Sequence, residues 1–181
     1  MPFGVRTLNL MRIESATMLN IGDAAPDFTL NDDAGKPVSL SSLLSSGPVV
    51  LYFYPADFTP VCTAEACMFR DWTAELAAAG VRVLGISPQG IESKQKFKQK
   101  HALSFPLLAD PDKAAIRAYG ASFLFGMFTR RVTYLIEPVA AAPATGRSGV
   151  IADRAVADLT VKPHEAFVKR VLAKHASGQR A

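Results

Sequence analysis

The sequence predicts an α/β protein with a central mixed, mostly parallel sheet flanked by helices on both faces. Two continuous apolar runs, 48–55 ("PVVLYFYP") and 81–87 ("VRVLGIS"), are rich in β-branched and aromatic residues. Runs of this kind are typical of strands buried on both faces of a sheet. Each is followed by a longer segment with helical periodicity, and strands that alternate with helices favour βαβ units with parallel neighbours.

The size and composition indicate one globular domain. The 181 residues are 49% hydrophobic and 20% charged, values typical of a protein with its own buried core. No apolar run approaches the roughly 20 residues that span a bilayer, so no membrane association is expected. We expect a flexible N-terminal extension over 1–17, the domain over 18–176 and a short tail over 177–181.

The N-terminal segment "MPFGVRTLNLMRIESAT" lacks the apolar core and the cleavage site of a secretory signal. Arg6 and Arg12, with no acidic residue before Glu14, would also suit an organelle transit peptide. A disordered or mis-started N-terminus, with Met11 or Met18 as the start, is the preferred interpretation. We therefore expect a cytoplasmic protein.

The net charge of +4 does not by itself indicate a nucleic-acid-binding protein. Lysines alternate with other residues along "ESKQKFKQKH", so that on a helix they spread around its surface. No aromatic-interleaved basic motif accompanies them. We expect a solvated helix face and no nucleic-acid partner. The lysines concerned are Lys94, Lys96, Lys98 and Lys100.

The first half of the chain predicts a hairpin, a buried strand and a long helix. Turn residues at Asp32–Gly35 divide the segment 28–47 into a hairpin, and a single helical turn follows it. After the strand at 48–55, apolar residues recur at helical spacing, and Gly80 ends that helix. The recurring residues are Met68, Trp72, Leu76 and Ala79.

The second half continues the alternation and ends in an amphipathic helix. We expect helices over 91–103, 113–120 and 162–176, and strands over 105–110, 130–138 and 149–159. Asp110 or Asp112 can cap the short helix, and Pro163 suits the first position of the last one. The Ala/Pro/Gly-rich stretch 137–149 is expected to be a loop that lengthens a hairpin. The last helix should turn four apolar side chains inward: Phe167, Val168, Val171 and Leu172.

Both cysteines of the chain, Cys62 and Cys67, lie in "YFYPADFTPVCTAEACMFRD" at the start of the first long helix. Cys62 is expected in the first helical turn, at the carboxyl end of a sheet strand, where open α/β folds bind ligands. Unpaired backbone N–H groups and the positive end of the helix dipole favour a thiolate there. Cys62 is therefore the expected nucleophile.

The role of Cys67 stays open on this reasoning. On a helix it lies about 7.5 Å along the axis from Cys62 and about 140° around it. The Cα atoms are then roughly 8–9 Å apart, beyond the ~7 Å limit for a disulfide. Either Cys67 is inert packing, or the helix unwinds when a bridge forms. The spacing fits neither a C-x-x-C motif nor a zinc site, so no metal or cofactor is expected, and the compartment is expected to be reducing.

The motif P-x-x-x-T-x-x-C, formed by Pro55, Thr59 and Cys62 in "PADFTPVCTAEAC", occurs together with several other stretches. These are "IGDAAPDFTL", "FRD", "GVRVLGIS", "FPLLADPDKAAIRAYGA", "RVTYLIE" and "VKPHEAFVKRVL". Over residues 20–173 the chain resembles the peroxiredoxins (AhpC/TSA), most closely the PrxQ or bacterioferritin-comigratory-protein subfamily. The resemblance implies a thioredoxin-like fold and thiol-dependent reduction of hydrogen peroxide and organic hydroperoxides.

The resemblance also implies a role for each residue of the motif. Cys62 attacks the peroxide and becomes a sulfenic acid, and Thr59 directs its hydroxyl to the thiolate and the peroxide. Pro55 and Pro60 stiffen the loop and shield the sulfur from water. Arg131, in "RVTYLIE", matches the arginine that binds the thiolate and the peroxide oxygens.

Three further residues complete the implied site. Arg130 is adjacent to Arg131 but should point to the opposite face of the strand. Glu65 is a candidate to orient Arg131, or simply an acid that suits a first helical turn. Val61 stands where many relatives have glycine, and the 139–148 loop is longer than their usual turn.

The C-x4-C spacing matches the subfamily in which the second cysteine resolves the sulfenic acid. By this resemblance Cys67 forms an intramolecular disulfide with Cys62, and thioredoxin or a glutaredoxin-like donor reduces it.

Two other functions stay open. A one-cysteine peroxidase would leave Cys67 inert and use an external thiol. A non-enzymatic redox sensor would report oxidation of Cys62 to a partner, and turnover with a reductant separates the two. A hydrolase would need a histidine beside the thiol, and we expect none to approach it from the helices that carry His101, His164 and His175. A monomer or weak homodimer is expected.

Overall fold

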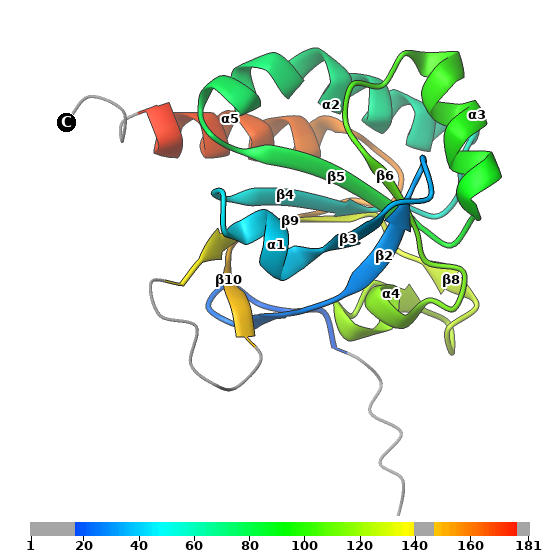
Figure 1. Ribbon diagram of the computed structural model, residues 1–181, viewed down its shortest axis with the longest axis horizontal. Helices are drawn as coiled ribbons and strands as arrows, with labels where there is room; N and C mark the ends of the chain where they lie inside the picture. Colours follow the sequence, from blue (N-terminus) through cyan, green and yellow to red (C-terminus); the bar gives the residue numbers. More distant parts are fainter. Residues whose placement is uncertain (1–16, 140–146, 177–181) are drawn as a thin grey trace, which may run out of the picture.

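The computed structural model describes residues 17–139 and 147–176. The expected N-terminal extension up to residue 16, the tail 177–181 and most of the 139–148 loop therefore lie outside the described residues. The rest forms a curved eight-stranded sheet in the order β1-β10-β9-β4-β5-β6-β2-β3, with a separate two-stranded hairpin β7-β8. Helices cover both faces of the sheet (Figure 1).

The predicted elements occur in the predicted order, and β1, β7 and β8 were not predicted. The strands are β1 (Ala24–Pro26), β2 (Thr29–Asp32), β3 (Pro37–Ser39), β4 (Val49–Phe53), β5 (Arg82–Ser87), β6 (Leu107–Ala109), β7 (Ser122–Phe123), β8 (Phe128–Thr129), β9 (Val132–Pro138) and β10 (Arg147–Val156). The helices are α1 (Leu40–Leu44), α2 (Pro60–Ala78), α3 (Ile91–His101), α4 (Ala114–Ala118) and α5 (Lys162–Ala176). None of the described helices is both long and apolar enough to cross a membrane.

The sheet is mixed, as predicted, but the prediction that it is mostly parallel is wrong. Among the described strands, parallel pairing is confined to β4–β5 and β5–β6. The other neighbours pair antiparallel. The cause is connectivity, because strands joined without a crossover helix, such as β2–β3 and β9–β10, can pair only antiparallel.

Strand β4 is the centre of the core. All of its residues are buried, and its side chains alternate between two apolar clusters. Val50 and Tyr52 pack with residues of α2, α3 and α5. Leu51 and Phe53 pack with residues of α1 and α4 on the other face, in agreement with the two helical layers in Figure 1.

Helix α2 begins at Pro60, with Thr59 as its N-cap. It ends at Ala78, and Gly80 follows in the left-handed region at φ +74°, as predicted. Of the predicted apolar stripe only Leu76 is fully buried, whereas the others are half-buried at its edge. The fully inward face instead consists of Cys62, Glu65, Ala66, Phe69 and Leu76.

The prediction that the α3 lysines form a solvated face is wrong for Lys94. Its side chain is fully buried, and its Nζ lies 2.9 Å from Asp57 Oδ1 and 3.1 Å from the Tyr54 hydroxyl. Lys98 is half-buried and pairs with Asp33 at 2.8 Å. Burial is possible because each ammonium group has a carboxylate partner from another part of the fold.

Two smaller predictions concern helix ends and faces. Asp110, rather than Asp112, caps α4: its carboxylate accepts hydrogen bonds from the N–H groups of Ala114 and Ile116 at 2.9 and 2.8 Å. Helix α5 begins at Lys162, one residue before Pro163. Its inward face carries the predicted Phe167, Val168 and Val171, with Leu172 packed at the edge, and also a buried His164.

Candidate active site

Cys62 is the third residue of α2 and is 1% exposed. Strand β4 ends at Phe53, and a short loop carries the chain from there to the helix N-terminus. The first-turn location predicted for Cys62 is therefore confirmed. Backbone N–H groups of the first turn and the helix dipole create a positive potential at this sulfur.

Arg131 reaches the sulfur from the position just before strand β9. Its guanidinium is 2% exposed, and Nη2 lies 3.1 Å from Cys62 Sγ. Val132 pairs with Phe53 in the β4–β9 register, which places Arg131 beside the carboxyl end of β4. The Arg131 backbone N–H donates to Asp158 Oδ1 at 2.9 Å, so the arginine is fixed at both its main chain and its head group.

Glu65 holds the other side of the same guanidinium. Arg131 Nη1 donates to Glu65 Oε2 in a fully buried ion pair. Burial raises the pKa of Glu65 to about 7, although the Arg131 charge acts in the opposite direction. The carboxyl group can therefore gain or lose its proton near neutral pH.

Arg130 points elsewhere, as strand alternation predicted. Its guanidinium carbon lies 4.6 Å from the centroid of the Phe123 ring in the β7–β8 hairpin. The side chains of the two adjacent arginines therefore contact different parts of the fold.

Thr59 and Pro55 lie on the loop that leads into α2, and the Thr59 hydroxyl is hydrogen-bonded to the loop backbone. It donates to the Ala56 carbonyl at 3.2 Å, while the Thr59 carbonyl accepts from the Thr63 N–H. Pro55 is half-buried, and its carbonyl accepts from Gln89 Nε2 at 3.5 Å. The predicted loop position is present, and the role of the Thr59 hydroxyl toward the thiolate and the peroxide stays a prediction.

Cys67 lies on the same helix, half-buried, and both cysteines are free thiols. Helix α2 continues without a break through both positions, so their Cα separation is roughly 8–9 Å by helix geometry. This structure does not bring the two thiols together.

His164 was not predicted to belong to this region. Its Nδ1 lies 3.4 Å from Glu65 Oε1 and 2.8 Å from Thr133 Oγ1. Burial lowers the pKa of His164 to about 4. Its spacing on α5 could have predicted that it is buried, because His164 lies one turn before Phe167 and Val168 on the apolar face.

The loop before Cys62 is anchored by a buried polar cluster that the sequence did not reveal. Asp57 Oδ2 accepts from the Ser93 hydroxyl at 2.6 Å, and Oδ1 accepts from Lys94. Gln89 Oε1 accepts from the Asp57 N–H at 3.3 Å and from the Ser87 hydroxyl at 2.6 Å. Lys94 Nζ also donates to the Ser87 hydroxyl.

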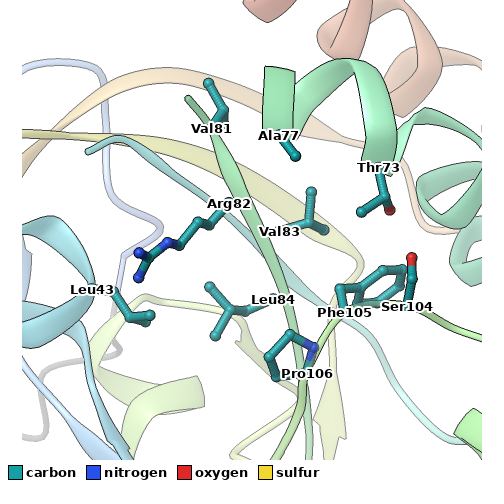
Figure 2. A pocket seen from close by; sticks show the side chains of 10 residues that line it. All are labelled: Leu43, Thr73, Ala77, Val81, Arg82, Val83, Leu84, Ser104, Phe105 and Pro106. Atoms are coloured by element: carbon teal, nitrogen blue, oxygen red, sulfur yellow. The ribbon is translucent and has the colours of Figure 1, made fainter. Parts of the chain in front are cut away.

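A separate apolar pocket has a volume of about 180 Å³, and Figure 2 shows the side chains that line it. None of the predicted site residues lines it. Its α2 contributors, Thr73 and Ala77, follow Cys62 by three turns or more, which is about 16 Å along the helix axis. The lining residues are Leu43, Thr73, Ala77, Val81, Arg82, Val83, Leu84, Ser104, Phe105 and Pro106. Within the described ranges, no group of three or more His, Cys, Asp or Glu side chains is arranged to hold a metal ion.

The model of the AhpC/TSA family matches residues 21–140, which include the cysteines, the loop before them and Arg131. The chain belongs to the AhpC/TSA family. Its family fold is also found in a solved structure, the peroxidoxin BcpB of Mycobacterium tuberculosis, which is 34% identical with a TM-score of 0.74. That match covers 86% of this chain and 97% of BcpB, and it confirms the thioredoxin-like fold.

Other AhpC/TSA relatives carry PrxQ or bcp names. A putative peroxiredoxin bcp of Coxiella burnetii is 44% identical over 66% of this chain and 82% of its own length. The chloroplastic peroxiredoxin Q of Oryza sativa subsp. japonica is 45% identical over 64% of this chain. The aligned region spans about half (54%) of the rice protein. A cysteine-to-serine mutant of the PrxQ of Xylella fastidiosa superposes with a TM-score of 0.75 at 26% identity, over 88% of this chain and 99% of that one.

Proposed function

We propose that this protein is a thioredoxin-dependent peroxidase that reduces hydrogen peroxide and organic hydroperoxides through Cys62. The observation that carries the proposal is the 3.1 Å contact between Arg131 Nη2 and Cys62 Sγ in a buried site at a helix N-terminus. A guanidinium and a helix N-terminus both stabilise a thiolate, the form of cysteine that attacks peroxides. The PrxQ and bcp names of the relatives support the same function.

In the first step, the Cys62 thiolate attacks one oxygen of the peroxide. An S–O bond forms, the O–O bond breaks, and the sulfur loses two electrons to become a sulfenic acid. The departing alkoxide or hydroxide takes up a proton and leaves as an alcohol or water. Arg131 is placed to donate hydrogen bonds to both the thiolate and the developing oxygen charge. The Thr59 hydroxyl would have to turn from Ala56 toward the peroxide.

In the second step, Cys67 attacks the sulfenic sulfur, an S–S bond forms and water leaves. Because an intact helix holds the two thiols apart, the first turns of α2 must open. Reduced thioredoxin, or a glutaredoxin-like dithiol, then restores both thiols by disulfide exchange.

Four further points belong to the proposal. The reaction uses no cofactor or metal ion. The protein acts as a monomer or weak homodimer. Its partners are a hydroperoxide and a dithiol donor, and neither a nucleic acid nor a membrane is needed. A reducing compartment, taken to be the cytoplasm, would keep Cys62 and Cys67 available.

A coupled assay tests the function directly. NADPH, thioredoxin reductase and thioredoxin are combined with the protein and either hydrogen peroxide or an organic hydroperoxide. We expect NADPH consumption that depends on the protein and is lost in Cys62→Ser, because a serine hydroxyl stays protonated near neutral pH and is a poor nucleophile. Activity within a few-fold of the wild type in Cys62→Ser would overturn the proposal. A sulfenic acid formed without turnover would favour the redox sensor.

A further inference from the structure

Four ionisable side chains form a continuous buried chain that starts at the reactive thiol. Cys62 contacts Arg131, Arg131 contacts Glu65, and Glu65 Oε1 lies 3.4 Å from His164 Nδ1. Glu65 and His164 are each 0% exposed. His164 comes from α5, about a hundred residues after the thiol in the chain, so the C-terminal helix forms the far wall of this cluster.

The hydrogen bonds of His164 indicate which of its two ring nitrogens carries a hydrogen. Nε2 lies 3.3 Å from the Ala157 carbonyl, which can only accept, so this nitrogen carries a hydrogen. Nδ1 lies 2.8 Å from the Thr133 hydroxyl, which can donate to it. The one Nδ1 lone pair of a neutral imidazole in this tautomer accepts from Thr133, so the ring offers Glu65 no N–H donor.

Glu65 Oε1 has no hydrogen-bond partner among the described residues. If Glu65 were ionised beside a neutral His164, its Oε1 atom would be a buried, charged acceptor without a donor, which is unfavourable. One proton, carried by either the carboxyl group or the imidazole, removes this unfavourable state. The geometry thus defines a place for one proton.

The charges of the cluster require the same proton. A Cys62 thiolate, the Arg131 guanidinium and a Glu65 carboxylate sum to one negative charge, and a single added proton makes the buried group neutral. The other facing groups do not supply that balance. Tyr52, whose buried hydroxyl has no described partner, has a pKa raised well above its usual value by burial and then by the Glu65 charge, and so stays neutral.

Charged groups farther out are already compensated. Asp158 is exposed to solvent and accepts the Arg131 backbone N–H. Asp57 and Lys94 form their own buried pair. The raised pKa of Glu65, about 7, and the lowered pKa of His164, about 4, both follow from burial and agree with one proton held on Glu65 below neutral pH.

We propose that His164 is a positioning residue for the thiol site, and that the Glu65–His164 pair holds one proton whose loss weakens the support that Arg131 gives to the Cys62 thiolate. The proposal rests on the proposed peroxidase function of Cys62. With the proton bound, the Arg131 charge acts mainly on the thiolate. With the proton lost, the Glu65 carboxylate shares the guanidinium and adds a negative charge nearby, so the reaction with peroxide slows as pH rises through this titration.

Substitutions of His164 in two opposite directions test the proposal. His164→Leu replaces the imidazole that lies 3.4 Å from Glu65 Oε1 with an apolar side chain and should favour the protonated carboxyl. His164→Asn places an amide N–H donor where Nδ1 stood and should favour the carboxylate. The inflection in the pH–rate profile, near 7 in the wild type, should move up by about one pH unit in the first variant and down by about one in the second. His175→Asn, on the same helix, is the matched control.

Two readouts separate failure of this inference from failure of the proposed function. The rate of Cys62 oxidation by hydrogen peroxide is followed in single turnovers from about pH 5 to about pH 9. The infrared C=O stretch of a protonated buried carboxyl, assigned with Glu65→Gln, is followed over the same range and needs no activity. If Cys62 does not react but the carboxyl band titrates in opposite directions in the two variants, the proton site stands and the peroxidase function fails. If the band and the rate inflection stay unchanged in both variants, the role of His164 is wrong.

Discussion

Arg131 Nη2 lies 3.1 Å from Cys62 Sγ although 69 residues separate the two in the chain. The contact depends on sheet register, because β4 and β9 pair antiparallel with Phe53 opposite Val132. A shift of one residue in that register would bring Arg130 toward the thiol instead.

Arg131→Met should therefore slow peroxide reduction strongly, whereas Arg130→Met should not. Removing one donor from a preorganised electrostatic site typically costs about 10²-fold or more in rate, and methionine keeps much of the arginine volume. The measurement is the second-order rate of Cys62 oxidation in each variant. Greater sensitivity of Arg130→Met would mean that the functional arginine had been assigned wrongly.

The Lys94–Asp57 pair should be a major contributor to stability. Lys94→Met leaves the Asp57 carboxylate buried without its cation, and breaking a buried pair in this way costs about 3–5 kcal/mol. Denaturant midpoints measure the change, and Lys96→Met, which removes an exposed partner of Glu92 on the same helix, should leave them unaltered. Asp57 also belongs to the loop before Cys62, so its release should slow peroxide reduction as well. Equal stability of the Lys94 and Lys96 variants would contradict the role of the buried pair.

These two regions show what the sequence could and could not predict. The buried strands and the first-turn position of Cys62 follow from local apolar runs and from the residues around one helix end. Burial of Lys94 depends on Asp57, 37 residues away, so no local pattern in α3 could reveal it.

The direction of strand pairing and the surroundings of Glu65 were equally nonlocal. Alternating strands and helices predict the parallel centre of the sheet, but not that hairpins extend it on both sides. His164 meets Glu65 only once α5 packs against α2, and the Thr59 hydroxyl is directed by the loop carbonyl that accepts its hydrogen bond.

The pH dependence of stability should contain two opposing contributions from the Glu65–His164 pair. Folded Glu65 has a pKa of about 7 instead of 4.5, so between these values folding takes up a proton and stability falls as pH rises. Folded His164 has a pKa of about 4 instead of 6.5, so folding releases a proton there and stability rises with pH. In the pH range where both groups titrate differently in the folded and unfolded states, their opposite effects on stability offset each other in the wild type.

Replacing one member of the pair should leave only the pH dependence of stability that the other member causes. In Glu65→Gln, stability should rise between pH 4.5 and 6.5, the range set by these two pKa shifts, with a slope of up to about 1.4 kcal/mol per pH unit. In His164→Leu it should fall over the same range. Urea denaturation at several pH values measures both slopes. Slopes of the same sign in the two variants would show that the groups do not titrate as opposed partners.

The last prediction concerns Cys67, which this structure holds on an unbroken helix with Cys62. If Cys67 resolves the sulfenic acid, α2 must open over its first one or two turns, losing several backbone hydrogen bonds worth about 1 kcal/mol net each. The oxidised protein should therefore exchange amide hydrogens faster than the reduced protein near the start of α2, and not in α5. Peptide mapping after one equivalent of peroxide should find a Cys62–Cys67 bridge within one chain. Cys67→Ser should instead stall at the sulfenic acid and over-oxidise more readily, because no thiol of its own chain can intercept that intermediate. Normal thioredoxin-dependent turnover in Cys67→Ser would assign resolution to an external thiol and make the protein a one-cysteine peroxidase.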